Sequence, residues 1–226
     1  MSMSALQLGI MSVKRRPVEI NYIGNASDTS NSISYTFSGQ SIGTASNDRV
    51  VLVTVGARQN SAITLSTVTI GGVSATQIAY AQFVGSGTEH SAIYAAKIPS
   101  GTTADIVVTF TDAALRCAIG VFAMTGSGVA ASDTDSTTSN SSGAFTASVD
   151  VPDNGSVLCA AWAGASGATS WTLSGVTEDF DIQPEISANA LASGHDNYET
   201  GQAVNLTATA TSTPLDGGVV MASWGP

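Results

Sequence analysis

The hydrophobic and polar positions of this chain follow the short period of β-strands, and helical spacing is nearly absent. From Ser32 onward, short runs rich in Val, Ile, Thr and aromatic residues alternate with clusters of Gly, Ser, Asn and Asp. The run from Val50 to Val55 is apolar except at Thr54, which is typical of a central strand covered on both faces. Residues 105 to 110 alternate as expected of a half-exposed strand. The pattern therefore predicts an all-β protein.

The strand pattern runs through one cycle and then largely repeats. The matched segments are Arg49 to Ala57 with Gly155 to Ala163, Thr69 to Ser74 with Thr172 to Thr177, Ile93 to Ala96 with Ile186 to Asn189, Thr103 to Thr109 with Gln202 to Ala208, and Cys117 to Met124 with Gly217 to Trp224. The segments recur in the same order while the loops between them vary, which indicates an internal duplication.

The two cycles are expected to build one sandwich. The candidate strands span residues 33–38, 49–55, 67–70, 75–83, 91–98, 104–111, 116–124, 144–151, 156–163, 170–173, 186–193, 203–211 and 219–224. The low-complexity stretch from Ser127 to Gly143 is interpreted as a surface crossover, because each half alone would leave long unpaired edges. We predict pseudo-repeats of about 32–126 and 142–226 within one cooperative domain, 25–226. Residues 25–130 alone are expected to be unstable.

Charge is distributed unevenly between the N-terminus and the rest of the chain. The net charge is −10, and Lys14, Arg15 and Arg16 are three of the seven basic residues, whereas the seventeen acidic residues all follow them. A nucleic-acid-binding role for the acidic body is excluded, because phosphate contacts need Lys and Arg. No run approaches the roughly 20 apolar residues of a membrane span. The basic residues follow the first apolar ones, the reverse of a secretory signal, so the N-terminus is interpreted as part of the mature chain.

Residues 1–24 are predicted to form an extended N-terminal arm, because they lack a sustained period and contain Pro17 and Gly24. We expect the arm to bind a partner. Its apolar side chains would be buried on that partner, and its basic side chains would steer the arm toward an acidic surface. The predicted partner-binding residues are Leu6, Leu8, Ile10, Lys14, Arg15 and Arg16.

The chain from Arg49 to Trp224 resembles a widespread set of phage and bacterial surface β-domains. The resemblance rests on the strings VVLVTVGAR, TVTIGGVSATQIA, IYAAKIPSGTTADIVVTF, AIGVFAMTG and GGVVMASW. It implies a jelly-roll-like or concanavalin-like antiparallel sandwich of two sheets, found in virion proteins of tailed phages. Such domains serve as capsid decoration proteins, tail or fibre modules and carbohydrate-binding modules, so the resemblance assigns no site residue.

Tests for catalysis and metal binding give no complete constellation. There is no G-x-S-x-G string, and His90 and His195, each beside a carboxylate, are interpreted as non-catalytic. Neither His nor Cys has the paired spacing of zinc ligands, and Cys117 and Cys159 are expected to be buried reduced thiols rather than a disulfide. We therefore predict a protein that is not an enzyme and needs no cofactor or metal.

Two acidic clusters leave calcium as an alternative. One is Glu178, Asp179, Asp181 and Glu185, and the other is Asp133 with Asp135. Carboxylates suit Ca²⁺, and those of the first cluster could also act as the paired acids of a glycosidase, but the second cluster lacks the Gly and closing Glu of an EF-hand. Both clusters are interpreted as solvated acidic loops.

The three tryptophans bear on glycan binding. Trp162, Trp171 and Trp224 lie within or beside strand runs, which favours core packing. Trp171 follows a small-residue loop that would expose it, so it is the candidate glycan contact.

These observations predict a non-enzymatic virion structural protein made in the bacterial cytoplasm. The first interpretation is a capsid decoration or cement protein, held by its N-terminal arm on capsid or tail proteins and forming a homo-oligomer. The alternatives are a phage tail or fibre component, or a carbohydrate-binding adhesin module that recognises a host-surface glycan.

Overall fold

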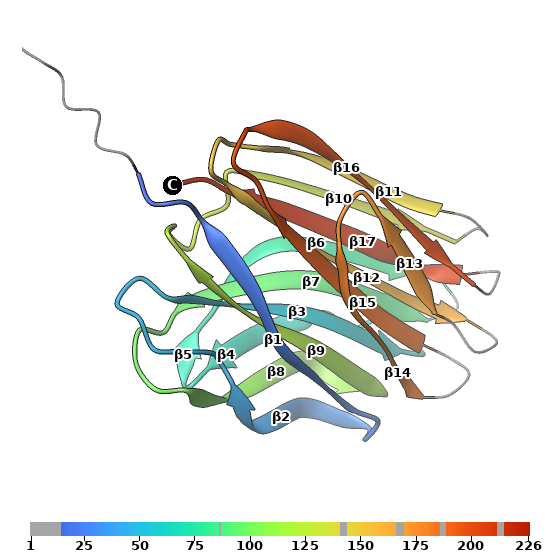
Figure 1. Cartoon of the computed structure of the whole chain (residues 1–226). Coiled ribbons are helices and arrows are strands. Elements are labelled where there is room, and N and C mark those ends of the chain that lie inside the picture. Colours follow the sequence, from blue (N-terminus) through green and yellow to red (C-terminus); the bar gives the residue numbers. More distant parts are fainter. Residues whose placement is uncertain (1–14, 86, 141–143, 166–169, 186–188, 212–214) are drawn as a thin grey trace, which may run out of the picture.

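The computed structural model describes residues 15–85, 87–140, 144–165, 170–185, 189–211 and 215–226. These residues form antiparallel β-strands and no helix (Figure 1). The described part accordingly contains no helix that could cross a membrane.

The strands follow the chain in two successive sets. The first set is β1 (Glu19–Asp28), β2 (Ser32–Ser41), β3 (Val50–Gln59), β4 (Leu65–Ile70), β5 (Val73–Ser74), β6 (Thr76–Val84), β7 (Thr88–Lys97), β8 (Thr103–Ala114) and β9 (Arg116–Thr125). The second set is β10 (Asp133–Ser139), β11 (Ala144–Val151), β12 (Ser156–Ala165), β13 (Trp171–Ser174), β14 (Glu178–Glu185), β15 (Asn189–Asn197), β16 (Gln202–Ala210) and β17 (Leu215–Trp224).

Each set folds into its own sandwich of two sheets. The first repeat has a five-stranded sheet ordered β1-β9-β3-β7-β6 and a smaller sheet ordered β2-β8-β4-β5, and the second has β10-β17-β12-β15-β14 and β11-β16-β13. In both repeats the first strand pairs with the last, the second with the next to last, and the third with the third from last. This nested pairing is that of a jelly roll. The predicted all-β, jelly-roll-like antiparallel sandwich with an internal repeat is confirmed.

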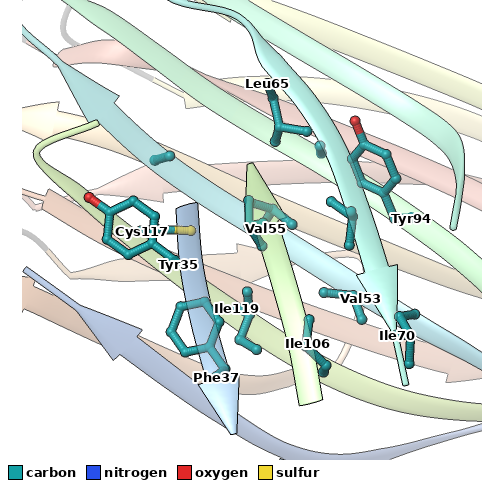
Figure 2. Close-up of a cluster of buried hydrophobic side chains, with 14 of the residues drawn as sticks. Tyr35, Phe37, Val53, Val55, Leu65, Ile70, Tyr94, Ile106, Cys117 and Ile119 are labelled. Carbon is teal, nitrogen blue, oxygen red and sulfur yellow. The ribbon is translucent and has the colours of Figure 1, made fainter. Parts of the chain in front are cut away.

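Three apolar clusters separate four layers of sheet. One cluster fills the first sandwich, including the side chains in Figure 2, and another fills the second sandwich. The third lies between the two five-stranded sheets, where Leu52 and Phe122 meet Leu158, Trp162 and Trp224. We call this contact the central interface. Alternate residues of β3 and β12 point into the repeat's own core and into the central interface, which explains why both strands are apolar almost throughout.

The arrangement of the repeats differs from the prediction. The two cycles do not complete one sandwich by covering each other's edges, because each closes its own sandwich and they meet through sheet faces. Whether the whole chain unfolds cooperatively stays a prediction. The reason to expect an unstable isolated half is now its exposed apolar face.

Some predicted boundaries also differ. Strand β1 occupies residues 19–28, so the end of the expected arm lies in a sheet, and β10 occupies part of the expected crossover. The match of Ile93 to Ile186 is wrong. Val55 and Ala161 are equivalent positions of the two repeats. Ala92 lies opposite Val55 and Ala192 lies opposite Ala161, so the strand of the second repeat that is equivalent to β7 is β15.

Candidate functional site

Of the predicted arm residues, the structure describes Arg15 and Arg16. Leu6, Leu8, Ile10 and Lys14 lie outside the described residues. Arg15 donates from Nη1 to the carbonyl of Pro226 at 2.6 Å. Arg16 pairs with Asp48 at 2.9 Å and also donates to Thr125 Oγ1 at 3.2 Å. Arg16 therefore pairs with an acidic residue of its own chain, whereas the prediction placed its acidic partner on a neighbouring copy or on the capsid.

The start of β1 is fastened to the second repeat. The Val18 N–H donates to the Asn154 carbonyl at 2.8 Å, and the Val18 carbonyl accepts from Ser156 Oγ at 2.8 Å. The side-chain amide of Asn197 then bonds both the N–H and the carbonyl of Ile20, at 2.9 and 3.1 Å. These contacts give an edge strand of one repeat hydrogen-bond partners from the other.

An open groove of about 870 Å³ lies beside this junction. It is lined by Arg15, Arg16 and Glu19 from the start of β1 and by Tyr198 and Glu199 from the turn after β15. The lining carries both signs of charge, so it does not select an anion or a cation by charge alone.

The cluster of Asp133 and Asp135 closes one open side of the second sandwich. Both residues lie on the edge strand β10, facing the edge strand β11 of the other sheet. Asp133 accepts the N–H groups of Thr134 and Asp150, and Asp135 accepts those of Ser136 and Ser148, each at 2.8 Å. The carboxylates thus satisfy N–H groups that an added strand would otherwise pair with. We call such an arrangement a carboxylate clasp.

A second carboxylate clasp closes the opposite side. On edge strand β14, Asp181 accepts the Trp171 N–H at 2.6 Å and Glu178 accepts the Leu173 N–H at 3.1 Å, both from edge strand β13. Burial raises the pKa of Asp181 to about 6, with Glu178 adding to the rise and the Trp171 N–H opposing it. The expected acidic loop is therefore a strand, and the side chain of Glu185 lies outside the described part.

The first carboxylate clasp gives a prediction about stability and calcium. Replacing Asp133 and Asp135 with Ala should lower the free energy of unfolding by about 1 to 3 kcal/mol and increase aggregation, because four edge N–H groups lose their acceptors. Urea unfolding and light scattering measure the two effects. Asp112→Ala is the control, since among the described residues its carboxylate bonds the N–H of the next residue, Ala113, and no other strand. A chelator should leave the melting temperature unchanged; a fall restored by Ca²⁺ would contradict the clasp assignment.

The two histidine and carboxylate pairs are separated by the strand period. Glu89 and His90 are neighbours on β7, so they point to opposite faces of the sheet, into the central interface and the first core respectively. His90 Nδ1 lies 2.8 Å from Tyr80 Oη, and burial lowers the pKa of His90 to about 4. His195 pairs with Asp179 at 2.7 Å rather than with Asp196. Neither sequence pair forms a dyad.

A buried polar cluster at one end of the central interface was not predicted. Glu89 is 2% exposed and accepts from Trp162 Nε1 at 2.6 Å, across the two repeats. Arg58 Nη1 lies 3.4 Å from the same carboxylate. Burial raises the pKa of Glu89 to about 8, against the opposing effects of Arg58 and Trp162. A proton-holding carboxyl at neutral pH is typical of functional sites, but this one has no exposed face for a substrate.

The tryptophans and cysteines are all buried. Trp171 is 4% exposed, packs edge to face on Phe145 at 5.6 Å, and donates from Nε1 to the Ala190 carbonyl at 3.1 Å. The prediction that Trp171 is an exposed glycan contact is therefore wrong. The prediction that the tryptophans pack in the core is confirmed. Cys117 and Cys159 are free and lie in different sandwich cores, as two separate buried thiols.

Comparisons of the chain with known proteins found no relative. The chain matches no family model, no curated protein and no solved structure. Within the described ranges, no group of three or more His, Cys, Asp or Glu side chains is arranged to hold a metal ion.

Proposed function

We propose that this chain is a non-enzymatic structural protein of a tailed-phage virion, acting as a capsid decoration or cement protein. The observation that carries the proposal is how its charged side chains are used. Asp133, Asp135, Glu178 and Asp181 bond the N–H groups of edge strands, and the fully buried Arg49 bonds loop carbonyls. Side chains that could serve in catalysis or metal binding thus hold strands and loops together instead. The resemblance of the strand motifs to phage surface domains supplies the virion context.

The attachment point in this proposal is the N-terminal segment. The contacts of Arg15, Arg16, Val18 and Ile20 tie the start of β1 to both repeats, so a load on residues 1–14 would be transmitted to the whole body. Leu6, Leu8 and Ile10 supply apolar area for a capsid protein or a neighbouring copy.

Particle composition tests the function. Density-gradient-purified virions from the source of this chain should contain it at a fixed copy number, measured by mass spectrometry, and an image of the particle should place it on the capsid. Density on the tail would favour the tail or fibre alternative. Its absence from intact particles would overturn the proposal.

Deletion of residues 2–14 tests the attachment. The variant keeps Arg15 and Arg16, so its melting temperature should equal that of the full chain, while its affinity for particles or other copies should fall about a hundredfold or more. The Arg15→Ala/Arg16→Ala variant should bind with a milder, salt-dependent loss. Particle occupancy by quantitative gel or mass spectrometry distinguishes the two. Wild-type occupancy after the deletion would show that the arm is not the tether.

A further inference from the structure

The two repeats are related across the central interface by a pseudo-two-fold axis. Strand β6 of the first repeat packs on β10 of the second, β7 packs on β17, and β3 packs on β12. On the other side of β3, β9 packs on β15 and β1 packs on β14. In chain order, β1, β3, β6, β7 and β9 correspond to β10, β12, β14, β15 and β17. The contact of β6 with β10 is therefore repeated by that of β14 with β1, and the contact of β7 with β17 by that of β15 with β9. The contact of β3 with β12 lies on the axis itself. The axis therefore runs between β3 and β12, along their length.

Equivalent residues of the two repeats face each other along this axis. Gly56 and Trp162 occupy the same position of their repeats, and a methyl group on Gly56 would overlap the Trp162 indole. Gly56 does not have a positive φ, so this close approach is what requires glycine. Arg58 and Gly164 are the next equivalent pair, and a Cβ atom on Gly164 would overlap the Glu89 carboxylate and lie 2.6 Å from Arg58 Nη1. Each pair combines a large side chain with a hole.

The row of residues next to the axis is unequal in charge. In the first repeat Arg58 lies opposite Glu89 and Arg116, and in the second repeat Gly164 lies opposite Asn189 and Asp216. The two rows contact each other. Arg116 donates to Asn189 Oδ1 at 2.6 Å, and the negative charge of Asp216 adds to the raised pKa of Glu89.

We propose that the central interface is a dimer interface made specific for unlike repeats by the hole and knob pairs on its axis. Two first repeats would leave a void at Gly56 and bring Arg58 against Arg58. Two second repeats would drive Trp162 into Trp162. The face of one repeat therefore fits the other repeat and rejects a second copy of itself, which keeps neighbouring chains from joining through this face.

Exchanging the knob and the hole in the full chain tests the axis. Gly56→Trp should lower the melting temperature strongly or prevent folding, and Trp162→Gly should lower it by opening a cavity. The double variant should recover at least half of the loss of the worse single variant, because the axis makes insertion from either repeat equivalent. Arg58→Gly with Gly164→Arg provides a second exchange on the same axis. Double variants no better than the worse single variants in both exchanges would overturn the proposed axis.

A cut between the repeats tests the specificity. A protease site inserted at Gly128, which is exposed and has open space around it, leaves the rest of the chain intact. After cleavage, the two fragments should still co-elute at the size of the uncut chain. When two differently tagged cleaved samples are mixed and allowed to exchange, tagged first fragments should capture second fragments and not each other. Separation of the fragments on cleavage, or capture of first fragments by one another, would contradict the proposal.

Discussion

Replacing Arg49 with Met is expected to lower the free energy of unfolding by about 3 to 5 kcal/mol, because several carbonyls lose a charged donor. The Arg49 guanidinium is 0% exposed and has no described carboxylate partner. It donates instead to four carbonyls, of Gly43 and Ile98 at 2.7 Å, Ser100 at 2.8 Å and Gly101 at 2.9 Å. Met fills much of the volume but leaves these acceptors without their charged donor, so the loops before β3 and after β7 lose their common anchor.

Urea unfolding at pH 7 measures the Arg49 effect. Arg49→Lys should recover only part of the loss, because an ammonium group cannot reach four carbonyls with the fixed fork of a guanidinium. Arg16→Met is the matched control, since Arg16 is exposed and pairs at the surface, and it should cost about 1 kcal/mol or less. A loss below about 1 kcal/mol for Arg49→Met would show that the loops hold without this donor.

Glu89 is expected to contribute stability to the folded protein that is lost as the pH rises through the range from about 4.5 to 8. The pKa of Glu89 is raised from 4.5 in the unfolded chain to about 8 in the folded protein. The folded state therefore holds a proton that the unfolded state releases. The stabilisation is complete below pH 4.5 and is lost as the pH rises to 8, by roughly 5 kcal/mol in total. Glu89→Gln keeps an acceptor for Trp162 Nε1 and should remove this loss.

His90 makes stability depend on pH in the opposite direction. Its pKa is lowered to about 4 from 6.5, so its contribution is complete above pH 6.5 and is lost by roughly 3 kcal/mol as the pH falls to 4. Urea midpoints at pH 5, 7 and 9 separate the two groups. Glu89→Gln should remove the decline between pH 7 and 9 and should uncover the rise due to His90 between pH 5 and 7. The exposed Glu199→Gln control should follow the wild type. An alkaline decline that persists unchanged in Glu89→Gln would rule out Glu89 as its source.

The sequence failed to predict three of the four edge strands of the two five-stranded sheets, and only the edge strand β6 was predicted. Strand β10, DTDSTTS, has no apolar side chain, because it is held by backbone pairing to β17 and by its own carboxylates. Strand β14 was interpreted as an acidic loop and β1 as part of an arm. A central strand needs apolar side chains on both faces, and an edge strand needs few, so hydrophobic pattern identifies the first kind far better.

The buried polar cluster could not be predicted for a related reason. Glu89 and His90 are adjacent in the sequence, and only the strand period separates them into two cores. Glu89 acquires its partner Trp162 from the other repeat, 73 positions away, through packing of two sheet faces. One signal was available: Gly56 corresponds to Trp162 in the matched segments, an unusual exchange of the smallest residue for the largest.

The sequence by itself determined the all-β class, the central strands and the duplication, because these depend on local alternation and its recurrence along the chain. Tertiary structure alone decided that each repeat closes its own sandwich and that the repeats meet face to face. Alternation states only that a side chain is covered, and a strand such as β3, apolar on both faces, is equally compatible with a second sheet of its own repeat or of the other. The choice was made by complementary shape and charge between positions far apart in the chain, and Gly56 with Trp162 is the clearest case.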